Sequence, residues 1–468
     1  MIYLFIQIII IKHMNDQNLM EKIVSLCKRR GFVFPSSEIY GGFSSTYDYG
    51  PLGAQILKNI KDLWWKHFVE TREDVLGLDG AIFCHPKTWE ASGHVSSFND
   101  PLVEDKITHI RYRADHLLEE KLKIETSKLS FSQMADLLKQ NEIKSPDGNE
   151  LTDLKSFNLL VEAELGSTNE NKSKAYLRGE TCQIIFLQYL NILQSSRVKI
   201  PFGIAQIGKA FRNEITTKDF LYRTREFTQM EMEYFVDPVE AEKAYSYWKE
   251  FMLDWFVNQL GLPKNSFRYR PIPKEEMSHY AKIQNDFEFR SSSGKWFELS
   301  PLNHRGDYDL SGHQKYSGKD FTYTDISGKS YIPNVVEISI GLDRTFYALM
   351  DNAYSEDGDR VILKLSPKLA PYKIAVFPLV RNKPEIIKKA REVFLYLKTL
   401  SLSVVWDDRG NIGKRYYAQD EIGTPWCVTV DYDTLEDDTV TVRDRDSAKQ
   451  ERVVISKLND YIESKLKV

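Results

Sequence analysis

The stretch GKAFRNEITTKDFLYRTREFTQMEMEYF, residues 208–235, decides the fold that the sequence predicts. It reads as two strands with polar faces, joined by a short loop. Because side chains alternate between the two faces of a strand, Arg212 and Glu214 are expected to share one face. An ordinary buried hairpin would place aliphatic residues there, so this pattern favours a site for a polar ligand.

The second predicted strand of this stretch carries a row of mixed chemistry. Arg223, Phe227 and Glu231 recur at spacings of four and are therefore expected on one strand face. A cation, an aromatic ring and a carboxylate in a line suit phosphate, adenine and amine groups. The alternative is a hairpin whose charged side chains only meet solvent.

A third segment, VVEISIGLDRTFYALM (335–350), reads as a strand running into a helix. Glu337 and Ser339 share a strand face, and Gly341 permits a close backbone approach. Arg344 falls in the first helical turn, where free N–H groups and the helix dipole favour anions. An arginine in a surface ion pair is the alternative.

Composition limits the class of protein. A chain of 468 residues should form two or three domains with a large core. The net charge of −4 gives no global signal for nucleic acid, so any RNA contact must come from local basic patches. The cysteines are scattered, which suits a reducing cytosol and argues against disulfides or a four-thiolate zinc site. They are Cys27, Cys84, Cys182 and Cys427.

The chain begins with an apolar run, MIYLFIQIIII. Eleven residues are too few for a membrane-spanning helix, which needs roughly 20, and the features of a secretory signal are missing. We therefore expect residues 1–19 to be disordered or to be an extension from a mis-set start codon, with Met14 or Met20 as the true start.

Other elements follow from periodicity. Helices are predicted at 54–70 and 239–260 from apolar residues at helical spacing. A strand is predicted at 77–83, and residues 263–335 read mostly as strand and loop. Residues 101–175, rich in Lys, Glu, Asn and Ser, read as an inserted module with a helix at 131–140.

After Pro367 the pattern predicts a compact α/β domain. The acidic run at 431–438 reads as a solvated turn. The predicted elements are strands at 372–378, 402–406, 426–431 and 439–443, and helices at 384–399, 411–422 and 450–466.

Together these segments resemble the three motifs of class II aminoacyl-tRNA synthetases in their usual order. The connecting text resembles the homodimeric glycyl-tRNA synthetases more specifically, over about residues 20–466. The segments that carry this resemblance are YGGFSSTYDYGPLG, GLDGAIFCHPKTWEASGH, LRGET, GIAQIGKAFRNEIT, RTREFTQMEMEYF, EISIGLDR and NIGKRYYAQDEIGTPWCVTVD. The resemblance implies an α+β catalytic domain with an antiparallel sheet, followed by a C-terminal α/β anticodon-binding domain.

The resemblance also implies domain limits and an activity. The catalytic domain would span 20–366, with the inserted module at about 101–175, and the anticodon-binding domain would span 367–468. The enzyme would use ATP and Mg²⁺ to activate glycine as glycyl-adenylate and transfer it to the 3′ end of tRNA(Gly). It would be a cytoplasmic homodimer without a membrane partner. Arg409, Lys414, Arg415 and Tyr416 would offer cations and a ring to the RNA.

By this resemblance, residues around the ATP take defined roles. Arg212 would hold the α-phosphate, Phe227 would stack on adenine, and Arg223 and Arg344 would clamp the γ-phosphate. The implied catalytic residues are Arg212, Glu214 and Arg344, and Glu214 and Glu298 would be the carboxylates near Mg²⁺. The implied ATP-binding set is Arg212, Asn213, Glu214, Tyr222, Arg223, Phe227, Glu298, Leu299, Gly341 and Arg344.

Glycine offers no side chain to grip. The resemblance implies that Glu180, Glu231 and Glu337 surround its ammonium group and that Ser339 lies against its α-carbon. Larger amino acids would overlap the pocket wall, so no editing site is expected. Arg113 and Arg305 match positions near the substrate.

The sequence departs from its relatives at several positions. Gly179 and Ile338 stand where many relatives have proline, and Ile184 stands where a glycine is usual, which puts pocket rigidity in doubt. The inserted module lacks the Cys-x-x-Cys pairs of many bacterial relatives, so no zinc is expected.

Two other functions remain open. A synthetase-like protein without catalysis would be expected to lose the ATP-clamping arginines or the ammonium-binding carboxylates, and this chain keeps both sets. A synthetase for another amino acid is the third reading, against which the three glutamates and Ser339 argue.

Overall fold

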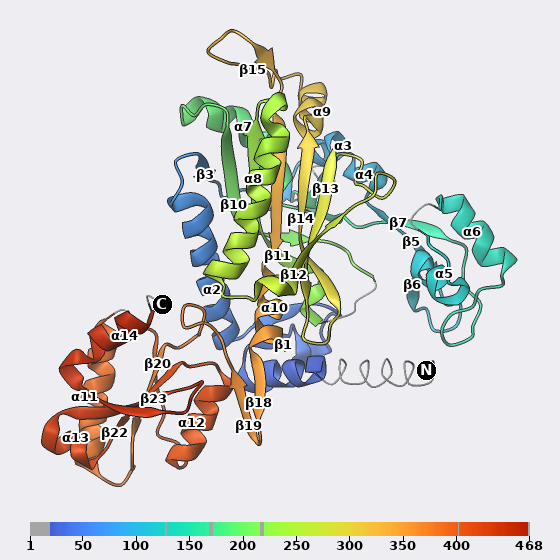
Figure 1. Ribbon diagram of the computed structural model, residues 1–468. Coiled ribbons are helices and arrows are strands. Elements are labelled where there is room, and N and C mark those ends of the chain that lie inside the picture. The colour runs from blue at the N-terminus through green and yellow to red at the C-terminus, as the bar shows by residue number, and fades with distance from the viewer. Residues whose placement is uncertain (1–18, 127–128, 168–171, 216–219, 401, 467–468) are drawn as a thin grey trace, which may run out of the picture.

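The structure, a computed structural model, has a central body, a small module set off to one side and a C-terminal domain below (Figure 1). It describes residues 19–126, 129–167, 172–215, 220–400 and 402–466. The predicted N-terminal extension therefore lies outside the described residues, apart from residue 19, which is helical together with residues 20–30.

A seven-stranded sheet forms the central body. Its strand order is β12-β13-β14-β17-β11-β10-β3, and every pairing is antiparallel except that of β10 with β3. The predicted α+β class with an antiparallel sheet is confirmed. The strands are β3 (Val75–Gly77), β10 (Phe202–Phe211), β11 (Glu226–Val236), β12 (Phe267–Pro271), β13 (Ile283–Arg290), β14 (Trp296–Gly306) and β17 (Asn334–Gly341).

Helices cover both faces of this sheet. On one face, α2 (Pro51–Trp65), α8 (Ala241–Asp254) and α10 (Leu342–Ala353) pack on Met230 and Met232 of β11. On the other face, α7 (Cys182–Ser195) packs on Phe235. Because side chains alternate along β11, Glu231 and Glu233 point toward the α7 face with Phe235, whereas Tyr234 packs on the other face with Met230 and Met232.

The helix predictions in the central body are confirmed, and residues 263–335 are mostly strand and loop as predicted, with one helix that the sequence did not predict. Both α2 and α8 continue into a π-helical turn, at Lys66–Glu70 and Trp255–Gln259. Within 263–335 the structure has the helix α9 (Tyr308–Ser317), whose sequence carries too few apolar residues to show helical periodicity.

The prediction of a strand at 77–83 is wrong. The sheet strand is β3, and a separate short strand, β4 (Phe83–Cys84), begins after a loop. In the loop between β3 and β4, the backbone groups of Gly80 bond to side chains and not to a neighbouring strand. The Gly80 N–H donates to Gln206 Oε1 at 3.2 Å, and Arg178 Nη1 donates to the Gly80 carbonyl at 2.7 Å.

The side module has its own three-stranded sheet and a small core in which Val103 meets Leu117 and Leu118. The predicted helix at 131–140 is confirmed as α6. The module elements are β5 (Asn99–Glu104), β6 (Arg111–Arg113), α5 (Ala114–Leu122), α6 (Phe131–Gln140) and β7 (Lys155–Asn158). The chain then returns to the main body and forms β8 (Val161–Leu165) and β9 (Ser173–Leu177). In this second three-stranded sheet, β9 lies between β4 and β8.

The C-terminal domain is a five-stranded sheet in the order β21-β20-β22-β23-β24. Its predicted α/β class is confirmed. The elements are β20 (Ile374–Pro378), α11 (Pro384–Thr399), β21 (Val404–Trp406), α12 (Ile412–Glu421), β22 (Trp426–Val430), α13 (Tyr432–Asp437), β23 (Thr439–Asp444), β24 (Gln450–Val454) and α14 (Leu458–Leu466).

Two predictions in this domain are wrong. The predicted solvated turn at 431–438 is the helix α13, which Asp431 and Thr434 begin with a reciprocal capping box. The first part of the predicted helix at 450–466 is instead β24, which adds to the sheet edge beside β23.

A hairpin joins the two large domains. It is formed by β18 (Tyr354–Asp357) and β19 (Arg360–Leu363). Arg360 donates to the buried Asp420 of α12 at 2.7 Å, and Arg443 donates to the same carboxylate at 2.9 Å. Short elements elsewhere are β1 (Val33–Pro35), β2 (Tyr47–Tyr49), α3 (Pro86–Ala91), α4 (His94–Ser97), β15 (Tyr323–Thr324) and β16 (Ser330–Tyr331).

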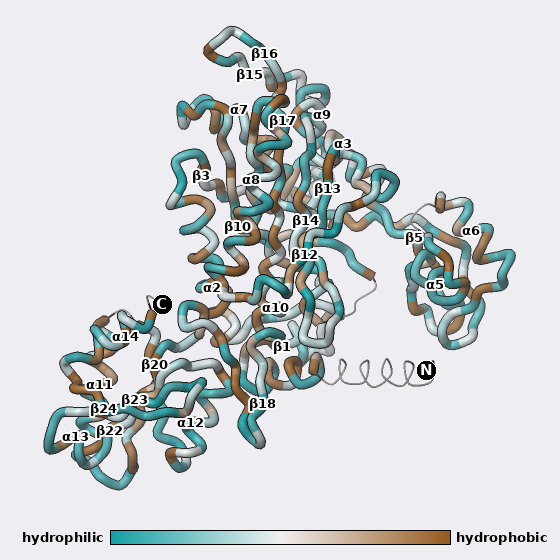
Figure 2. Tube along the Cα trace, viewed as in Figure 1, coloured by the Kyte–Doolittle hydropathy of each residue, from teal (hydrophilic) through white to brown (hydrophobic). Residues whose placement is uncertain are grey.

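Most helices mix polar and apolar residues along their length (Figure 2). Among the described residues, none of the helices is both long enough and apolar enough to span a bilayer.

Candidate active-site cleft

A cleft of about 580 Å³ opens over the central sheet. It is lined from β11, β14, β17, the start of α10 and the loop that joins β10 to β11. The structure brings most of the residues implied by the family resemblance together here. Those that line the cleft are Glu180, Arg212, Glu214, Tyr222, Arg223, Phe227, Glu298, Leu299, Ser339, Gly341 and Arg344.

The prediction that Arg212 and Glu214 share a strand face is wrong. β10 ends at Phe211, so Arg212 and Glu214 lie in the following loop and not on a strand face. Arg223 likewise precedes β11. The loop backbone is held by its own bonds, among them the Arg212 N–H to the Arg225 carbonyl at 2.9 Å. The side chains reach the cleft from this loop.

Arg212 is held between two aromatic rings. Its guanidinium carbon lies 5.0 Å from the ring centre of Phe98 and 5.2 Å from that of Phe227. Its Nε also donates to the Gly179 carbonyl at 3.1 Å. A cation fixed in this way meets an anion with little loss of side-chain entropy.

Arg344 also lines the cleft and is held in place by its neighbours. Its Nη1 lies 3.2 Å from Glu298 Oε1, and its guanidinium stacks 4.4 Å from the ring centre of Tyr222. Burial opposes the charge, but Glu298 raises the pKa of Arg344, so the guanidinium stays charged. The sequence left open whether Arg344 forms an ion pair. It does so with Glu298, and both residues line the cleft.

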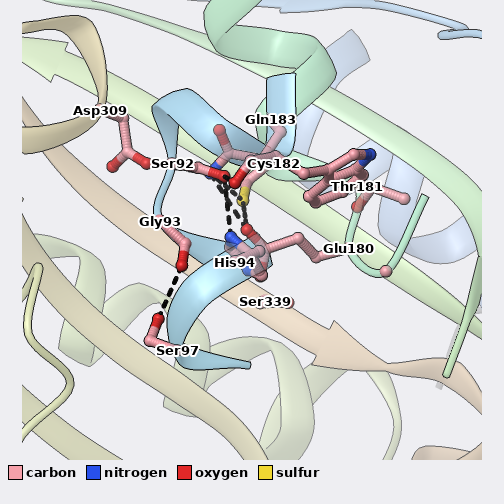
Figure 3. A network of polar contacts seen from close by, with 12 residues as sticks. Ser92, Gly93, His94, Ser97, Glu180, Thr181, Cys182, Gln183, Asp309 and Ser339 are labelled. Carbon is pink, nitrogen blue, oxygen red and sulfur yellow. Dashed lines mark hydrogen bonds and ion pairs between the residues drawn. The ribbon is translucent and has the colours of Figure 1, made fainter. Parts of the chain in front are cut away.

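Of the three glutamates, Glu180 lines the cleft and lies in a network of polar partners that includes His94 and Gln183 (Figure 3). Glu180 lies 3.3 Å from His94 Nε2 and accepts from Gln183 Nε2 at 3.1 Å. Ser92 Oγ is 2.8 Å from His94 Nδ1. Burial would raise the pKa of Glu180, but His94 and Arg305 hold it well below its usual range.

Glu337 is not a free carboxylate. Arg305 Nη1 lies 3.0 Å from Glu337 Oε1, and the same guanidinium lies 2.7 Å from Asp309 Oδ2. The Asn303 amide also donates to Glu337. The three predicted carboxylates thus share their surroundings with a buried protein cation, which lessens their mutual repulsion.

Glu231 lies deepest of the three and is 1% exposed. The Thr181 hydroxyl donates to it. Burial, with Glu337 and Glu180 close by, raises the pKa of Glu231 to about 8. Ser339, directly opposite on β17, accepts from the Gln229 amide at 2.9 Å and faces the cleft.

Five implied residues do not line the cleft. Glu231, Glu337 and Arg305 are buried near Glu180, whereas Asn213 and Arg113 lie elsewhere. Asn213 is exposed, and its N–H donates to the Leu159 carbonyl at 2.8 Å. Arg113 lies on β6 of the side module, 2.7 Å from Asp100 and 2.7 Å from Asp115.

Several polar residues near the three glutamates were not singled out from the sequence. His94 ends the segment GLDGAIFCHPKTWEASGH, and Asp309 opens α9. Glu233 lies two residues after Glu231 on the same strand, so the period of two that placed Glu231 could have found it.

The four cysteines are free and buried. Cys84 packs in a small apolar cluster with Trp89. The neighbouring His85 accepts from the Lys87 N–H at 3.2 Å and so begins α3.

Comparison with known proteins identifies two domains. The tRNA synthetase class II core domain (G, H, P, S and T) matches residues 161–353, and the anticodon binding domain matches residues 373–465. Curated relatives span nearly the whole chain. A glycine–tRNA ligase of Alkaliphilus oremlandii is 46% identical over 97% of this chain and 100% of its own length. One of Caldanaerobacter subterraneus is 45% identical over 96% and 98%.

Solved structures support the fold. A prolyl-tRNA synthetase from Cryptosporidium parvum, in complex with proline and AMP, aligns with a TM-score of 0.64 over 95% of this chain and 74% of that chain. At 16% sequence identity this likeness concerns the fold alone.

Proposed function

The chain belongs to the glycine–tRNA ligases of the class II synthetase fold, and we propose that its cleft makes glycyl-adenylate from glycine and ATP. The glycyl group then passes to the 3′ end of tRNA(Gly). The observation that carries this proposal is the placement of charge. Held arginines and a set of acidic residues meet in one cleft, which suits the phosphates of ATP beside an ammonium group.

The arginine end suits ATP. Arg212, Arg223 and Arg344 would bind the phosphates, and Phe227 would stack on adenine. Glu214 and Glu298 offer carboxylate oxygens at the cleft, the ligands that Mg²⁺ prefers. Bound Mg²⁺ would neutralise phosphate charge. In the first step the glycine carboxylate attacks the α-phosphorus and pyrophosphate leaves. Held cations favour this step by positioning and by stabilising charge.

The acidic end suits glycine. Glu180, Glu231 and Glu337 would bind the ammonium group, and Ser339 would lie near the α-carbon. In the second step the terminal hydroxyl of the tRNA attacks the carbonyl carbon, and AMP leaves. A larger amino acid would clash with the pocket wall, so selection would need no hydrolytic editing site.

Pyrophosphate exchange tests this function. ATP–pyrophosphate exchange should require glycine and should be weak with alanine or serine at equal concentration. Equal exchange with alanine or serine, or no exchange with glycine in a folded protein, would overturn the proposal. Charging of tRNA(Gly) transcript then tests the second step.

Glycine binding should tighten as pH rises toward 8. Glu231 has its pKa raised to about 8, so below that pH it is protonated in the ligand-free protein. An ammonium group needs the ionised form, so binding must release a proton. The glycine KM should therefore fall by up to about tenfold per pH unit and level off above pH 8. Exchange assays at several pH values measure it; a flat profile would contradict the role of Glu231.

The metal requirement should be magnesium alone. Exchange should stop when Mg²⁺ is chelated and resume when it is restored. The side module lacks cysteine pairs, so we expect no stoichiometric zinc. Elemental analysis of dialysed protein checks this, and one zinc per chain would contradict it.

We further propose a homodimer in the cytoplasm. A cavity of about 250 Å³ near α7 is lined by Phe83 and Leu187, two exposed apolar side chains that a second subunit would cover. Light scattering should give twice the chain mass of 54.5 kDa. A Phe83→Asp variant should shift the protein toward the monomer, whereas a single-chain mass for the unaltered protein would contradict the proposal.

A further inference from the structure

Glu233 is a buried acid that the proposed chemistry leaves without a role. Its side chain is 0% exposed, and it does not line the cleft. Within the described part of the chain, neither carboxylate oxygen has a hydrogen-bond partner. A buried polar group of this kind is costly unless its charge is removed or its bonds are made.

Its surroundings are strongly acidic. Glu231 lies on the same strand, and Glu337 lies directly opposite on β17. With the Cys182 thiol of α7, ligand atoms of all four residues fall within 4.8 Å of one another. Arg305 of β14 and Asp309 of α9 border this group. Burial raises the pKa of Glu233, Glu337, Glu231 and Asp309 raise it further, and Arg305 lowers it. Glu180 and His94 lie on the cleft side.

The neighbouring acids already receive donors. Glu231 accepts from the Thr181 hydroxyl, and Glu337 accepts from Asn303 and Arg305. Glu180 accepts from Gln183 and meets His94. Asp309 accepts twice from Arg305. An ionised carboxylate needs such donors, whereas a protonated carboxyl group can donate to an acceptor of its own.

Charge balance requires that some acid in this group hold a proton. Arg305 is the permanent cation that pairs directly with this group, at Glu337 and Asp309. The Arg178 guanidinium also attracts Glu231 but donates to backbone carbonyls, so two cations serve four acids. Glu233 is the member without a donor, and it is the most enclosed. It is therefore the acid that stays neutral at the least cost.

We propose that Glu233 is held as a neutral carboxylic acid that donates its O–H to Glu337, and that this bond positions Glu337 for the ammonium group of glycine. The proposal rests on the proposed function of the cleft. Glu233 then acts as a positioning residue from beneath the site. Its own burial and the neighbouring carboxylates, which raise its pKa, keep the proton on Glu233 while Glu337 stays paired with Arg305.

Three variants separate this role from its alternatives. Glu233→Leu fills the space without a donor, and Glu233→Gln keeps a donor but has no proton to lose. Glu231→Gln is the matched control, because it removes a charge from the same face of the same strand. Each variant is assayed as the full chain by pyrophosphate exchange, with thermal unfolding as the check on folding.

The expected results differ in size and kind. Glu233→Leu should raise the glycine KM by about tenfold or more and leave the ATP KM within about twofold, the loss typical of a hydrogen bond to a charged group. Glu233→Gln should recover most of that loss. Glu231→Gln should raise the glycine KM by about a hundredfold, because it removes an ionic partner.

Other outcomes would overturn the proposal. If Glu233→Gln raised the glycine KM as much as Glu231→Gln, Glu233 would be an ionised ligand. If Glu233→Leu folded and left the glycine KM unchanged, the side chain would only fill space. A tightly held metal ion, found by elemental analysis and lost in Glu233→Gln, would mean that a cation replaces the proton.

An infrared measurement keeps this test separate from the proposed function. Above pH 8, where Glu231 ionises, the ligand-free protein should still show the carbonyl stretch of a protonated carboxyl group, and Glu233→Gln should lack it. This band needs no substrate, so its presence supports the protonated acid even if glycine exchange fails. An identical spectrum for the two proteins would refute the proposal.

Discussion

An Arg344→Ala enzyme should fold normally and make glycyl-adenylate about 10²- to 10³-fold more slowly than the unaltered chain. Arg344 starts α10 in the cleft and is held by Glu298 and by the ring of Tyr222. A held cation of this kind stabilises phosphate charge more in the transition state than in the bound substrate. Exchange kinetics at saturating glycine would measure the loss in kcat/KM for ATP.

Two further variants test whether this loss is specific to the Arg344 guanidinium. Arg344→Lys keeps the charge but loses the planar fork, so it should recover only part of the rate. Arg268→Ala is the control for removing an arginine, because Arg268 pairs with Glu288 and stacks on Trp296 outside the cleft lining. Normal exchange by a folded Arg344→Ala protein would remove Arg344 from the site.

Removing the C-terminal domain should separate the two steps of the reaction. Glycine activation should largely persist, whereas charging of tRNA should fall by about 10²- to 10⁴-fold, because the RNA loses one of two linked binding surfaces. The cut belongs after Tyr372 and not at 367. Leu369 packs in the catalytic core, and Asn59 donates to the Leu369 carbonyl at 3.0 Å. Equal loss of both activities would show that the domain only supports the fold.

Full-length variants sharpen this test. Arg409 and Lys414 are exposed, so Arg409→Glu and Lys414→Glu should weaken charging and its tRNA KM without affecting exchange. Arg415 is unsuitable as an RNA contact, contrary to the sequence prediction. It is 2% exposed, and its guanidinium donates to backbone carbonyls, including that of Gly410 at 2.9 Å. The Tyr416 hydroxyl likewise bonds to Thr429.

Periodic apolar patterns predicted the long helices. The elements that they missed are short, polar or formed by pairing with a neighbouring strand. Helices such as α8 and α11 carry apolar residues at helical spacing and were predicted from it. α9 has little apolar content, and α13 is a single short helix whose capping residues were read as a turn. β24 gains its strand form from pairing with β23, which no local pattern reveals.

The resemblance to glycyl-tRNA synthetases predicted most of the residues that line the cleft. The separate argument that Arg212 and Glu214 share a strand face was wrong. Arg212 and Glu214 lie beyond the end of β10 and still reach the ligand side. The partners of the glutamates were harder to predict, because they come from distant parts of the chain. Arg305 lies 32 residues from Glu337, and His94 lies far before Glu180. Such pairings depend on the fold and leave no mark in sequence spacing.

The hairpin that joins the large domains limits how this protein can be recombined. Asp420 accepts from Arg443 of its own domain and from Arg360 of the β18–β19 hairpin, and it is fully buried. A foreign C-terminal domain joined after Tyr372 would leave Arg360 without an acceptor if it lacked a carboxylate at this place. An exchange that starts at Tyr354 would carry both partners, but it would also replace catalytic-core residues such as Leu369. A functional chimera therefore needs a junction after Tyr372 together with a carboxylate at the position of Asp420.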